Sequence, residues 1–559
     1  MNIGTSYKRH GIQGEFDSIV IGSGIGGLVS AALLANHADQ KVLVLERHYT
    51  AGGYTHTFKR KGFEWDVGVH YIGDVMHPKN ELRKVFDDVC DGNLQWADMG
   101  EVYDTIVIDG DRYDLVKGRE NLRKQLKSYF PGEEDAIDQY IQLVRETVFN
   151  GRLYFMEKAL PPLLGKVFGP LLRRKVLKVA EKTTGEVLES LTSNKRLQAV
   201  LAGQYGDYGL PPKDASFFIH AMVAKHYFEG GAYPVGGSEQ MAATILPVIE
   251  RKGGKVLTNA AVAEIIMKGN RAVGVRMEDG TEAFAKTIIS DAGIRNTYGH
   301  LLPEAARKKY GFAKKLENVP PSVAHISLYI GLNTTSENLG LTKNNRWVYP
   351  GDDHNASVDN YLADPDNNPL PVAYLSFPSA KDPSFQSRFP GKGTVEVVGL
   401  APYDWFSKWE GTRWKKRGDD YEALKAKLTK RLLEPLLEEY PQIEAHIEHM
   451  ELSTPLSTKT FCNFEKGEIY GLEHTPKRFK QDWLRPQTPI KGLYLTGADI
   501  CSCGIGGAVF GGVLQVSAQL KRNMLAPISK RAKEMYRPFD PAQFETPASQ
   551  DGTPASVAI

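Results

Sequence analysis

The chain has 559 residues, a formal charge of +2 at neutral pH and 24% charged residues. This balance gives no general basic surface, so no nucleic-acid partner is expected. Its four cysteines, Cys90, Cys462, Cys501 and Cys503, have neither the density of a disulfide framework nor the paired spacing of a metal site, so no metal is expected. The N-terminus lacks the apolar core of a secretory signal, which predicts a cytoplasmic-side location without a signal peptide.

The segment 17–53 has the pattern of a dinucleotide-binding unit. A buried strand (18–21), a glycine turn, a helix to about Asn36 and a second strand (41–45) ending on Glu46 follow in that order. The uncharged run within it is about long enough to span a bilayer, but its four glycines make a membrane helix a poor interpretation. Strand, turn, helix, strand and acid in succession predict a bound dinucleotide.

Each glycine of this turn has its own structural role. Gly22 allows the sharp turn, Gly24 lets the backbone approach a pyrophosphate, and Gly27 lets the helix pack closely on the strand. The helix N-terminus then presents free N–H groups and partial positive charge to the phosphates. Glu46, roughly 20 residues beyond the glycines, is placed to accept hydrogen bonds from a ribose.

The next parts of the chain change in pattern. Gly52 and Gly53 suggest another close backbone approach, and the segment that follows suggests paired short strands. Residues 81–216 are predicted to be mostly helical, and within them 160–179 is both apolar and basic. That segment fits either a helix in a membrane interface or an ordinary cap helix with a solvated basic face, and both interpretations stay open.

The second half returns to strands. Residues 235–297 have α/β patterning, and 323–400 alternate with period two, which predicts a second sheet with helices such as 421–432. The uncharged run 500–520 is rich in glycine and predicts a buried helix directed at the cofactor rather than a membrane span. Beyond Met524 the composition predicts a flexible tail.

These pieces together resemble a known family. Besides the opening unit, the resemblance is carried by Asp66-Val-Gly-Val-His-Tyr71, Tyr233-Pro-Val-Gly-Gly-Ser238, Asp291-Ala-Gly293 and Leu495-Thr-Gly-Ala-Asp499. The chain, to about Asn523, is similar to the phytoene desaturase, carotenoid isomerase and retinol saturase group of FAD enzymes. Within the group, 226–238, Phe377-Pro-Ser-Ala-Lys-Asp-Pro383 and 494–504 look most like the retinol saturases.

The resemblance implies an α/β fold with a Rossmann-like FAD domain of the amine oxidase and phytoene desaturase type. It implies an inserted substrate domain of mixed sheet and helix as well. The expected division is FAD-binding parts at 15–79, 226–320 and 486–525, a helical cap at 80–225, a substrate domain with an antiparallel sheet at 321–485, and a flexible tail at 526–559.

The resemblance also implies which residues hold FAD. The pyrophosphate would be surrounded by Gly22, Ser23, Gly24, Gly26 and Gly27. The adenosine ribose would contact Glu46, and the adenine would contact Val262. The nearby chain would contribute Arg47, Gly52 and Gly53. The terminal motif would contribute Gly497 and Asp499 at the ribityl or pyrophosphate end, and Ile505, Gly506, Gly507 and Ala508 would begin a helix aimed at the flavin. For Asp499, a helix N-cap is a compatible second role.

The implied function is an oxidoreductase that saturates one carbon–carbon double bond of a retinoid, a carotenoid or a related isoprenoid. The alternatives are a carotenoid cis–trans isomerase or desaturase of the same family, and a flavin-free carrier of lipid or prenyl groups on the same fold. An apolar polyene substrate predicts a long apolar cleft and peripheral contact with a membrane. The sequence does not identify the electron donor or acceptor.

Saturation adds a hydride at one carbon and a proton at its neighbour, so a proton donor is needed. The candidates in the motifs nearest the flavin are His70, Tyr71 and Tyr233. His70 has a side chain that titrates near neutral pH, but a structural histidine behind the flavin is the alternative. Tyr71 and Tyr233 are better interpreted as walls of the substrate cleft than as acids.

Overall fold

The predicted dinucleotide unit lies at the centre of a parallel sheet. The computed structural model describes residues 3–540. The sheet consists of β1 (Thr5–Ser6), β10 (Lys255–Thr258), β3 (Val42–Leu45), β2 (Ser18–Ile21), β14 (Thr287–Ser290) and β20 (Leu493–Leu495), in this spatial order. The turn after β2 leads into α2 (Ile25–Ala38), so the predicted order of strand, turn, helix and strand is confirmed.

Both faces of this sheet are buried, which explains the nearly continuous apolar sequence of its strands. Val20 and Val44 face a layer of helices, whereas Ile19 and Leu43 face the opposite core. The helix layer consists of α2, α10 (Gln240–Arg251), α20 (Gly504–Leu520) and α3 (Glu81–Val89). A small antiparallel sheet, β11 (Val262–Lys268), β12 (Arg271–Met277) and β13 (Glu282–Phe284), covers the other face.

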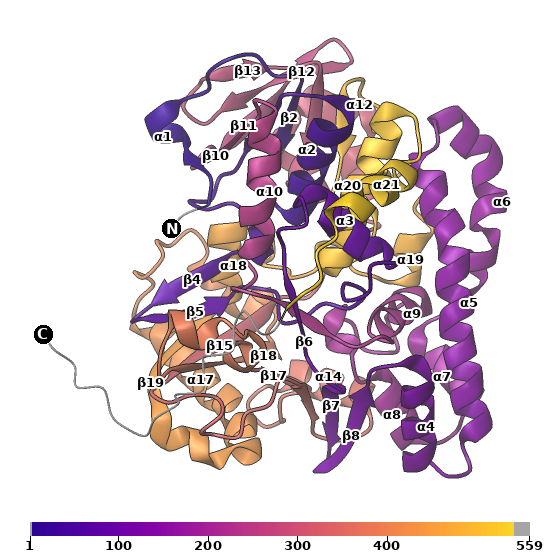
Figure 1. Ribbon diagram of the computed structural model, residues 1–559, viewed down its shortest axis with the longest axis vertical. Coiled ribbons are helices and arrows are strands. Elements are labelled where there is room, and N and C mark those ends of the chain that lie inside the picture. The colour runs from indigo at the N-terminus through magenta and orange to yellow at the C-terminus, as the bar shows by residue number, and fades with distance from the viewer. Residues whose placement is uncertain (1–2, 541–559) are drawn as a thin grey trace, which may run out of the picture.

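A second, seven-stranded sheet lies below the first in Figure 1. Its order is β19 (Ile447–Ser453), β15 (His325–Leu332), β18 (Gly393–Leu400), β17 (Ala373–Ser376), β16 (Asn345–Tyr349), β7 (Val102–Ile108) and β8 (Asp111–Val116). Side chains alternate across it: Val395 and Val397 pack toward α17 (Asp419–Glu439), while Val398 lies on the opposite face. The predicted second sheet is therefore present, with one face left for another layer.

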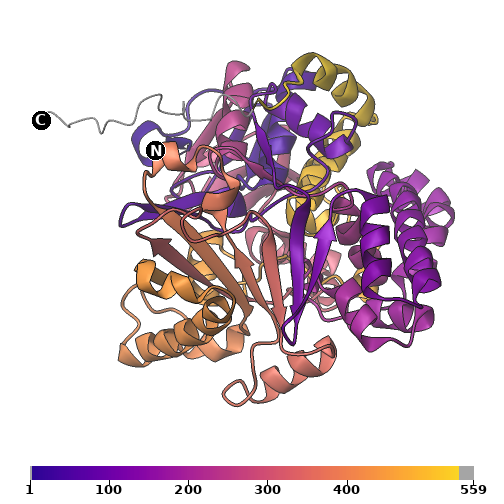
Figure 2. The ribbon, with the colours of Figure 1, turned by 60° about the horizontal axis from the view of Figure 1, so that its bottom comes forward.

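Strands β7 and β8 lie within residues 81–216, which are mostly helical, as predicted. They form a hairpin at the edge of the second sheet, where β7 pairs with β16 in parallel, and Figure 2 shows them continuing that sheet. The sequence does contain the signal, because Asp109-Gly110 is a preferred hairpin turn and directly follows the β-branched run Thr105-Ile-Val-Ile108. The segment 80–225 thus belongs in part to the sheet that the prediction assigned to 321–485.

The part of that segment that follows β8 is mainly helical, as predicted, and forms the purple layer on the right of Figure 1. It consists of α4 (Arg119–Tyr129), α5 (Glu134–Ala159), α6 (Pro162–Ala180), α7 (Thr184–Leu191), α8 (Lys195–Ala202) and α9 (Phe217–His226). Glu134 and Asp135 complement the dipole at the start of α5. Between residues 3 and 540, no helix has the length and apolar character needed to cross a membrane.

The shorter elements connect these layers. Two short ladders are β4 (Thr57–Arg60) with β5 (Phe63–Asp66), as predicted, and β6 (Trp96–Asp98) with β9 (Ala232–Pro234). The shorter helices are α1 (Tyr7–His10), α11 (Ile294–Asn296), α12 (Glu304–Tyr310), α13 (Phe312–Leu316), α14 (His354–Ala363), α15 (Pro378–Lys381), α16 (Phe385–Arg388), α18 (Pro455–Cys462) and α19 (Pro476–Phe479).

The predicted flexible tail is wrong over its first part. Residues Leu525–Met535 form α21, which packs on α3 and buries Ile528 and Ala532. A guanidinium N–H of Arg531 donates to the carbonyl of Asp88 at 2.6 Å. Apolar residues at helical spacing, hidden in a polar composition, therefore fix this segment. The rest of the predicted tail, 541–559, lies outside the described residues.

The docking of α21 can be tested by truncating its buried side chain. Ile528 is completely buried, so Ile528→Ala is expected to lower the free energy of unfolding by about 2–5 kcal/mol, measured by chemical denaturation. The control is Lys530→Ala on the exposed face of the same helix, which is expected to change the value by less than about 0.5 kcal/mol. Equal effects of the two changes would contradict a docked helix.

Candidate functional site

A cavity of about 2290 Å³ joins the parallel sheet to the seven-stranded sheet. At one end it is lined by the turn after β2 and the start of α20, and at the other by α5, α9 and the inner face of the second sheet. Pockets for a single drug-sized ligand measure about 300–1,000 Å³. The cavity therefore has room for a dinucleotide and a second large molecule together.

The glycine turn brings bare backbone to the cavity surface. Gly22 has a φ of +96°, a conformation that favours glycine. A Cβ atom on Gly26 would lie 2.4 Å from Cα of Gly497, and one on Gly24 would lie 2.5 Å from Oδ2 of Asp291. No larger residue fits at either position without moving its neighbours, so these glycines let the start of α2 pack closely while its backbone lines the cavity.

Of the residues predicted to surround a pyrophosphate, some line the cavity and others lie behind its wall. Gly22, Gly24 and Gly26 line the cavity. Ser23 and Gly27 lie behind its wall: a Cβ on Gly27 would lie 2.5 Å from the carbonyl oxygen of Gly22, which is the close helix–strand packing expected of it. Ser23 instead holds Glu46, through its N–H at 2.9 Å and its hydroxyl at 2.7 Å.

Glu46 lines the cavity at the end of β3 and is 8% exposed. Its Oε2 accepts the two bonds from Ser23, and its Oε1 accepts the N–H of His48 at 2.7 Å. Because each carboxylate oxygen has two acceptor positions, Oε1 keeps capacity for a ligand hydroxyl. Of the other predicted residues on this side, Arg47, Gly52, Gly53 and Val262 also line the cavity.

The second predicted acid, Asp499, also lines the cavity, but its side chain bonds within the protein. Its Oδ2 accepts the N–H of Ile294 at 2.7 Å, and its Oδ1 accepts the N–H of Leu472 at 3.2 Å. It therefore joins two loops at the cavity wall and does not cap α20, whose N-cap is Cys503.

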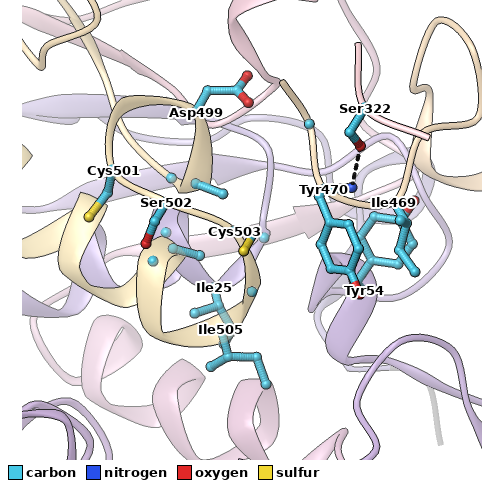
Figure 3. A pocket seen from close by; sticks show the side chains of 18 of the residues that line it. Ile25, Tyr54, Ser322, Ile469, Tyr470, Asp499, Cys501, Ser502, Cys503 and Ile505 are labelled. Carbon is cyan, nitrogen blue, oxygen red and sulfur yellow. Dashed lines mark hydrogen bonds between the residues drawn. The ribbon is translucent and has the colours of Figure 1, made fainter. Parts of the chain in front are cut away.

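The start of α20 faces the cavity, as the sequence predicted. Gly497 and the run Ile505, Gly506, Gly507 and Ala508 are all part of the lining. A Cβ on Gly506 would meet nothing closer than 3.9 Å, so this position opens toward free space. Figure 3 shows the turn that carries Cys501, Ser502 and Cys503 on one side of the pocket, with Tyr470 on the other.

A third acid, Asp291, lies beneath the glycine turn and was not predicted as a site residue. Burial and the nearby charges of Glu46 and Asp499 raise the pKa of Asp291 to about 8. It is therefore mainly neutral at neutral pH, which limits its repulsion of an anionic ligand above the turn. The exposed backbone of the glycine turn suits a pyrophosphate, and the carboxylate of Glu46 suits a ribose hydroxyl. This end of the cavity therefore fits a dinucleotide.

The far end of the cavity is apolar and aromatic. Helices α5 and α9 contribute Phe155, Phe218 and Met222, while the second sheet contributes Trp347 and Val398. A ligand there would be surrounded mainly by carbon.

His70, a predicted proton donor, lines the cavity but is neutral. Burial, with Lys381 nearby, lowers the pKa of His70 to about 3. Its Nδ1 lies 2.9 Å from Oε2 of Glu396, whose pKa burial raises to about 8. At neutral pH the imidazole is therefore in its neutral form, which is a far weaker acid than the imidazolium, so the structure does not favour His70 as the proton donor.

The two predicted tyrosines lie in different places relative to the cavity. Tyr71 lines the cavity and stacks on Tyr227, with ring centroids 4.3 Å apart. The structure does not bring Tyr233 to this wall, because its ring is buried behind it and its hydroxyl donates to Asp66. Among the three candidates, Tyr71 alone combines a place on the wall with a proton-bearing hydroxyl.

Sequence reasoning missed a buried polar network that passes behind this wall. Nζ of Lys381 donates to the carbonyl of His70 at 2.9 Å, to the hydroxyl of Ser376 at 2.8 Å and to Asn345. Nδ2 of Asn345 in turn donates to Asp104 at 2.9 Å. The available signal was the presence of acids inside otherwise apolar strands, as at Asp104 in β7, since a buried charge needs partners.

Comparisons with known proteins agree with this geometry. Residues 25–518 match the family described as flavin containing amine oxidoreductase. All-trans-retinol 13,14-reductase from Danio rerio is 38% identical over 528 residues, covering 91% of this chain and 87% of that protein. A chloroplastic prolycopene isomerase from an Oncidium hybrid cultivar is 26% identical over 537 residues, covering 92% and 86%.

A solved structure has the same fold. It is an oxidoreductase from Methanosarcina mazei, with a TM-score of 0.60 and 15% identity, matched over 90% of this chain and 100% of that one. The predicted α/β fold and the predicted resemblance to the retinol saturase and carotenoid isomerase group are thereby confirmed. The chain belongs to the flavin containing amine oxidoreductase family.

Proposed function

We propose that this protein is an FAD-dependent reductase that saturates one carbon–carbon double bond of a retinoid or a related polyene. The observation that carries the proposal is a single cavity that joins a dinucleotide-binding end to an apolar, aromatic end. The similarity to a retinol 13,14-reductase supports this reaction over others available to a flavin enzyme. The substrate end suits a long hydrocarbon chain, because such a ligand needs few polar partners.

In this proposal, the residues of the glycine turn and the start of α20 hold the cofactor. Gly22, Gly24 and Gly26 present backbone to the pyrophosphate, Glu46 accepts hydrogen bonds from the ribose, and Val262 contacts the adenine. When bound, the flavin supplies hydride transfer. The protein's own part is to orient the polyene, to exclude water and to deliver one proton.

The cofactor assignment is tested by releasing the bound chromophore from purified protein. One FAD per chain, identified by chromatography and mass after denaturation, is the expected result. Protein that is colourless and cannot be reconstituted with FAD would refute the enzyme assignment and would favour the carrier. Anaerobic reoxidation of the reduced holoenzyme by all-trans-retinol, followed by absorbance, then tests the substrate class.

A second candidate function is cis–trans isomerisation of a carotenoid, which the prolycopene isomerase relative favours. The same cavity would serve both reactions, since each needs a flavin beside an extended polyene. The two differ in the mass of the product, because isomerisation adds no hydrogen.

We further propose that an apolar face formed by α5 and α6 rests on a membrane. On α6, Leu163, Val167 and Leu171 are 79%, 70% and 68% exposed, and on α5 the side chain of Phe149 is 67% exposed. The cavity lining includes Met156 on this same side, so the face adjoins an edge of the cavity. Lys166, Arg174, Lys175 and Lys178 on α6 are exposed as well, which suits anionic headgroups.

Replacing three of these side chains is expected to weaken membrane binding. Burying a Val or Leu side chain contributes about 1.5–3 kcal/mol, so Leu163→Ser, Val167→Ser and Leu171→Ser together are expected to reduce liposome partitioning more than tenfold. The matched control changes three exposed apolar residues elsewhere, Phe284→Ser, Leu362→Ser and Met450→Ser. Equal co-sedimentation of the two variants would count against this face.

A further inference from the structure

The hydroxyl of Tyr71 lies between two carboxyl groups. Its oxygen is 2.7 Å from Oδ2 of Asp104 and 3.1 Å from Oδ2 of Asp207. A tyrosine hydroxyl carries one hydrogen, so it donates a full hydrogen bond to only one of them. The other contact is a hydrogen bond only when that carboxyl group is protonated and donates to the tyrosine oxygen.

The surrounding donors decide which carboxyl group is ionised. Asp104 accepts Nδ2 of Asn345 at 2.9 Å and Nε2 of Gln204 at 2.8 Å, besides the shorter contact with Tyr71. Three donors favour the carboxylate form of Asp104. The side-chain carboxyl of Asp207 has Tyr71 as its hydrogen-bond partner. The proton of the pair therefore resides on Asp207, which donates it to Tyr71.

Electrostatics point the same way. Burial and the charge of Asp104 raise the pKa of Asp207 well above its ordinary value, while the pKa of Asp104 is raised to about 6. Two carboxyl groups bridged by one hydroxyl do not ionise together without strong repulsion. The titratable groups around Asp207 are acidic, and each is neutral or negative: Tyr71, Tyr103, Asp104, Tyr208, Tyr227, Tyr349, Tyr374, Tyr470 and Cys503.

Asp207 lies where the two ends of the cavity meet. It closes the short helix η2 (Tyr205–Asp207) and is part of the cavity lining. Its carbonyl accepts the thiol of Cys503 at 3.5 Å, and the preceding carbonyl, of Gly206, accepts the hydroxyl of Tyr470 at 2.7 Å. Cys503 and Tyr470 face each other across the pocket in Figure 3, so Asp207 is tied to both walls there.

We propose that Asp207 is the acid that protonates the substrate carbon, an assignment that rests on the proposed function. A reduced flavin, held by the glycine turn and the start of α20, would supply a hydride to one carbon of the double bond. The π electron pair forms the second C–H bond with the proton of Asp207, whose O–H bond breaks and leaves a carboxylate. Tyr71 turns its hydrogen to that carboxylate until a proton from water restores the acid. The two electrons come from a reduced donor such as dithionite.

A first test needs no turnover. Infrared difference spectra between the flavin-free wild type and Asp207→Asn at neutral pH are expected to show the loss of one protonated carboxyl band, while the protonated carboxyl groups of Asp291 and Glu396 cancel in the difference. Asp111→Asn, at an exposed position on β8, is the matched control and is expected to keep the band. If Asp207→Asn leaves the spectrum unchanged, the carboxyl group of Asp207 is not protonated and the proposal fails.

A second test measures proton delivery in a single turnover of the holoenzyme. Reoxidation of reduced Asp207→Asn by all-trans-retinol is expected to be slower by about 10²–10⁴-fold, with flavin content and dithionite reduction unchanged. Asp207→Glu is expected to restore part of the rate and to keep the solvent deuterium isotope effect of the wild type. A wild-type rate in Asp207→Asn overturns the assignment of Asp207 as the acid but not the proposed function. Failure of the wild-type protein to reduce any polyene overturns the proposed function and this inference with it.

Discussion

Replacing Gly506 by leucine is expected to give a folded protein that has lost its flavin. Gly506 lies in the first turn of α20, and a Cβ there meets nothing closer than 3.9 Å. Leucine also forms helix more readily than glycine by up to about 1 kcal/mol, so the fold should not suffer. Its side chain would instead occupy cavity space that we assign to the cofactor.

The size of this effect follows from overpacking. Forcing extra carbon atoms into an occupied space costs about 1–3 kcal/mol, so FAD affinity is expected to fall by up to about 100-fold. Titration of flavin-free protein with FAD, followed by fluorescence, measures the change. Gly506→Ala is the control at the same position and is expected to bind FAD nearly as the wild type does. Wild-type affinity in Gly506→Leu would place the cofactor elsewhere.

Replacing Val398 by tryptophan is expected to block the substrate while leaving the flavin in place. Val398 lies on β18, on the face of the second sheet that lines the apolar end of the cavity. An indole there would fill space opposite α5 and α9 without reaching the glycine turn. Reoxidation of the reduced protein by all-trans-retinol is expected to slow at least 100-fold, because the polyene no longer fits.

Flavin content and reduction by dithionite provide the internal control for this change. Both are expected to match those of the wild type in Val398→Trp. Val398→Ile, which adds a single methylene, is the smaller change at the same position and is expected to lower the activity much less than Val398→Trp does. Unchanged retinol turnover in Val398→Trp would show that the substrate binds at another place.

The parts of this fold that sequence reasoning predicted are those with local signals. The turn at Gly22 and the helix after it depend on residues close together in the chain, and the alternation of β18 is visible within a few residues. The hairpin of β7 and β8 had a local signal too, in Asp109-Gly110, but its membership of the second sheet depends on pairing with β16. That pairing joins residues more than two hundred positions apart and has no local signature.

The candidate site shows the same division. Gly24, Gly26 and Glu46 were found because a dinucleotide motif is contiguous, and they line the cavity. Asp207 was missed because its chemistry arises from Tyr71 and Asp104, which reach it from separate segments. A carboxyl group becomes an acid at neutral pH through burial and a charged neighbour, and neither is visible in a sequence.

For His70, the structure favours the alternative of a structural histidine over that of an acid. A histidine in a motif near the flavin is a reasonable candidate for an acid, because its ordinary pKa is close to neutral. In the folded protein, burial and Lys381 hold it neutral, so its residue type gave a misleading indication. Tyr233 was misleading in another way, since its place beside a glycine turn leads its hydroxyl to Asp66 and away from the cavity.

The mass of the product formed by reduced, FAD-loaded protein tests the central claim most directly. Reduced protein is incubated without oxygen with all-trans-retinol and, separately, with carotenoids, and the products are separated and weighed by mass spectrometry. We predict the gain of two hydrogens at one double bond, with loss of the product in Val398→Trp. An unchanged mass with altered geometry would show an isomerase, and a loss of hydrogens a desaturase. Either result would contradict the reductase.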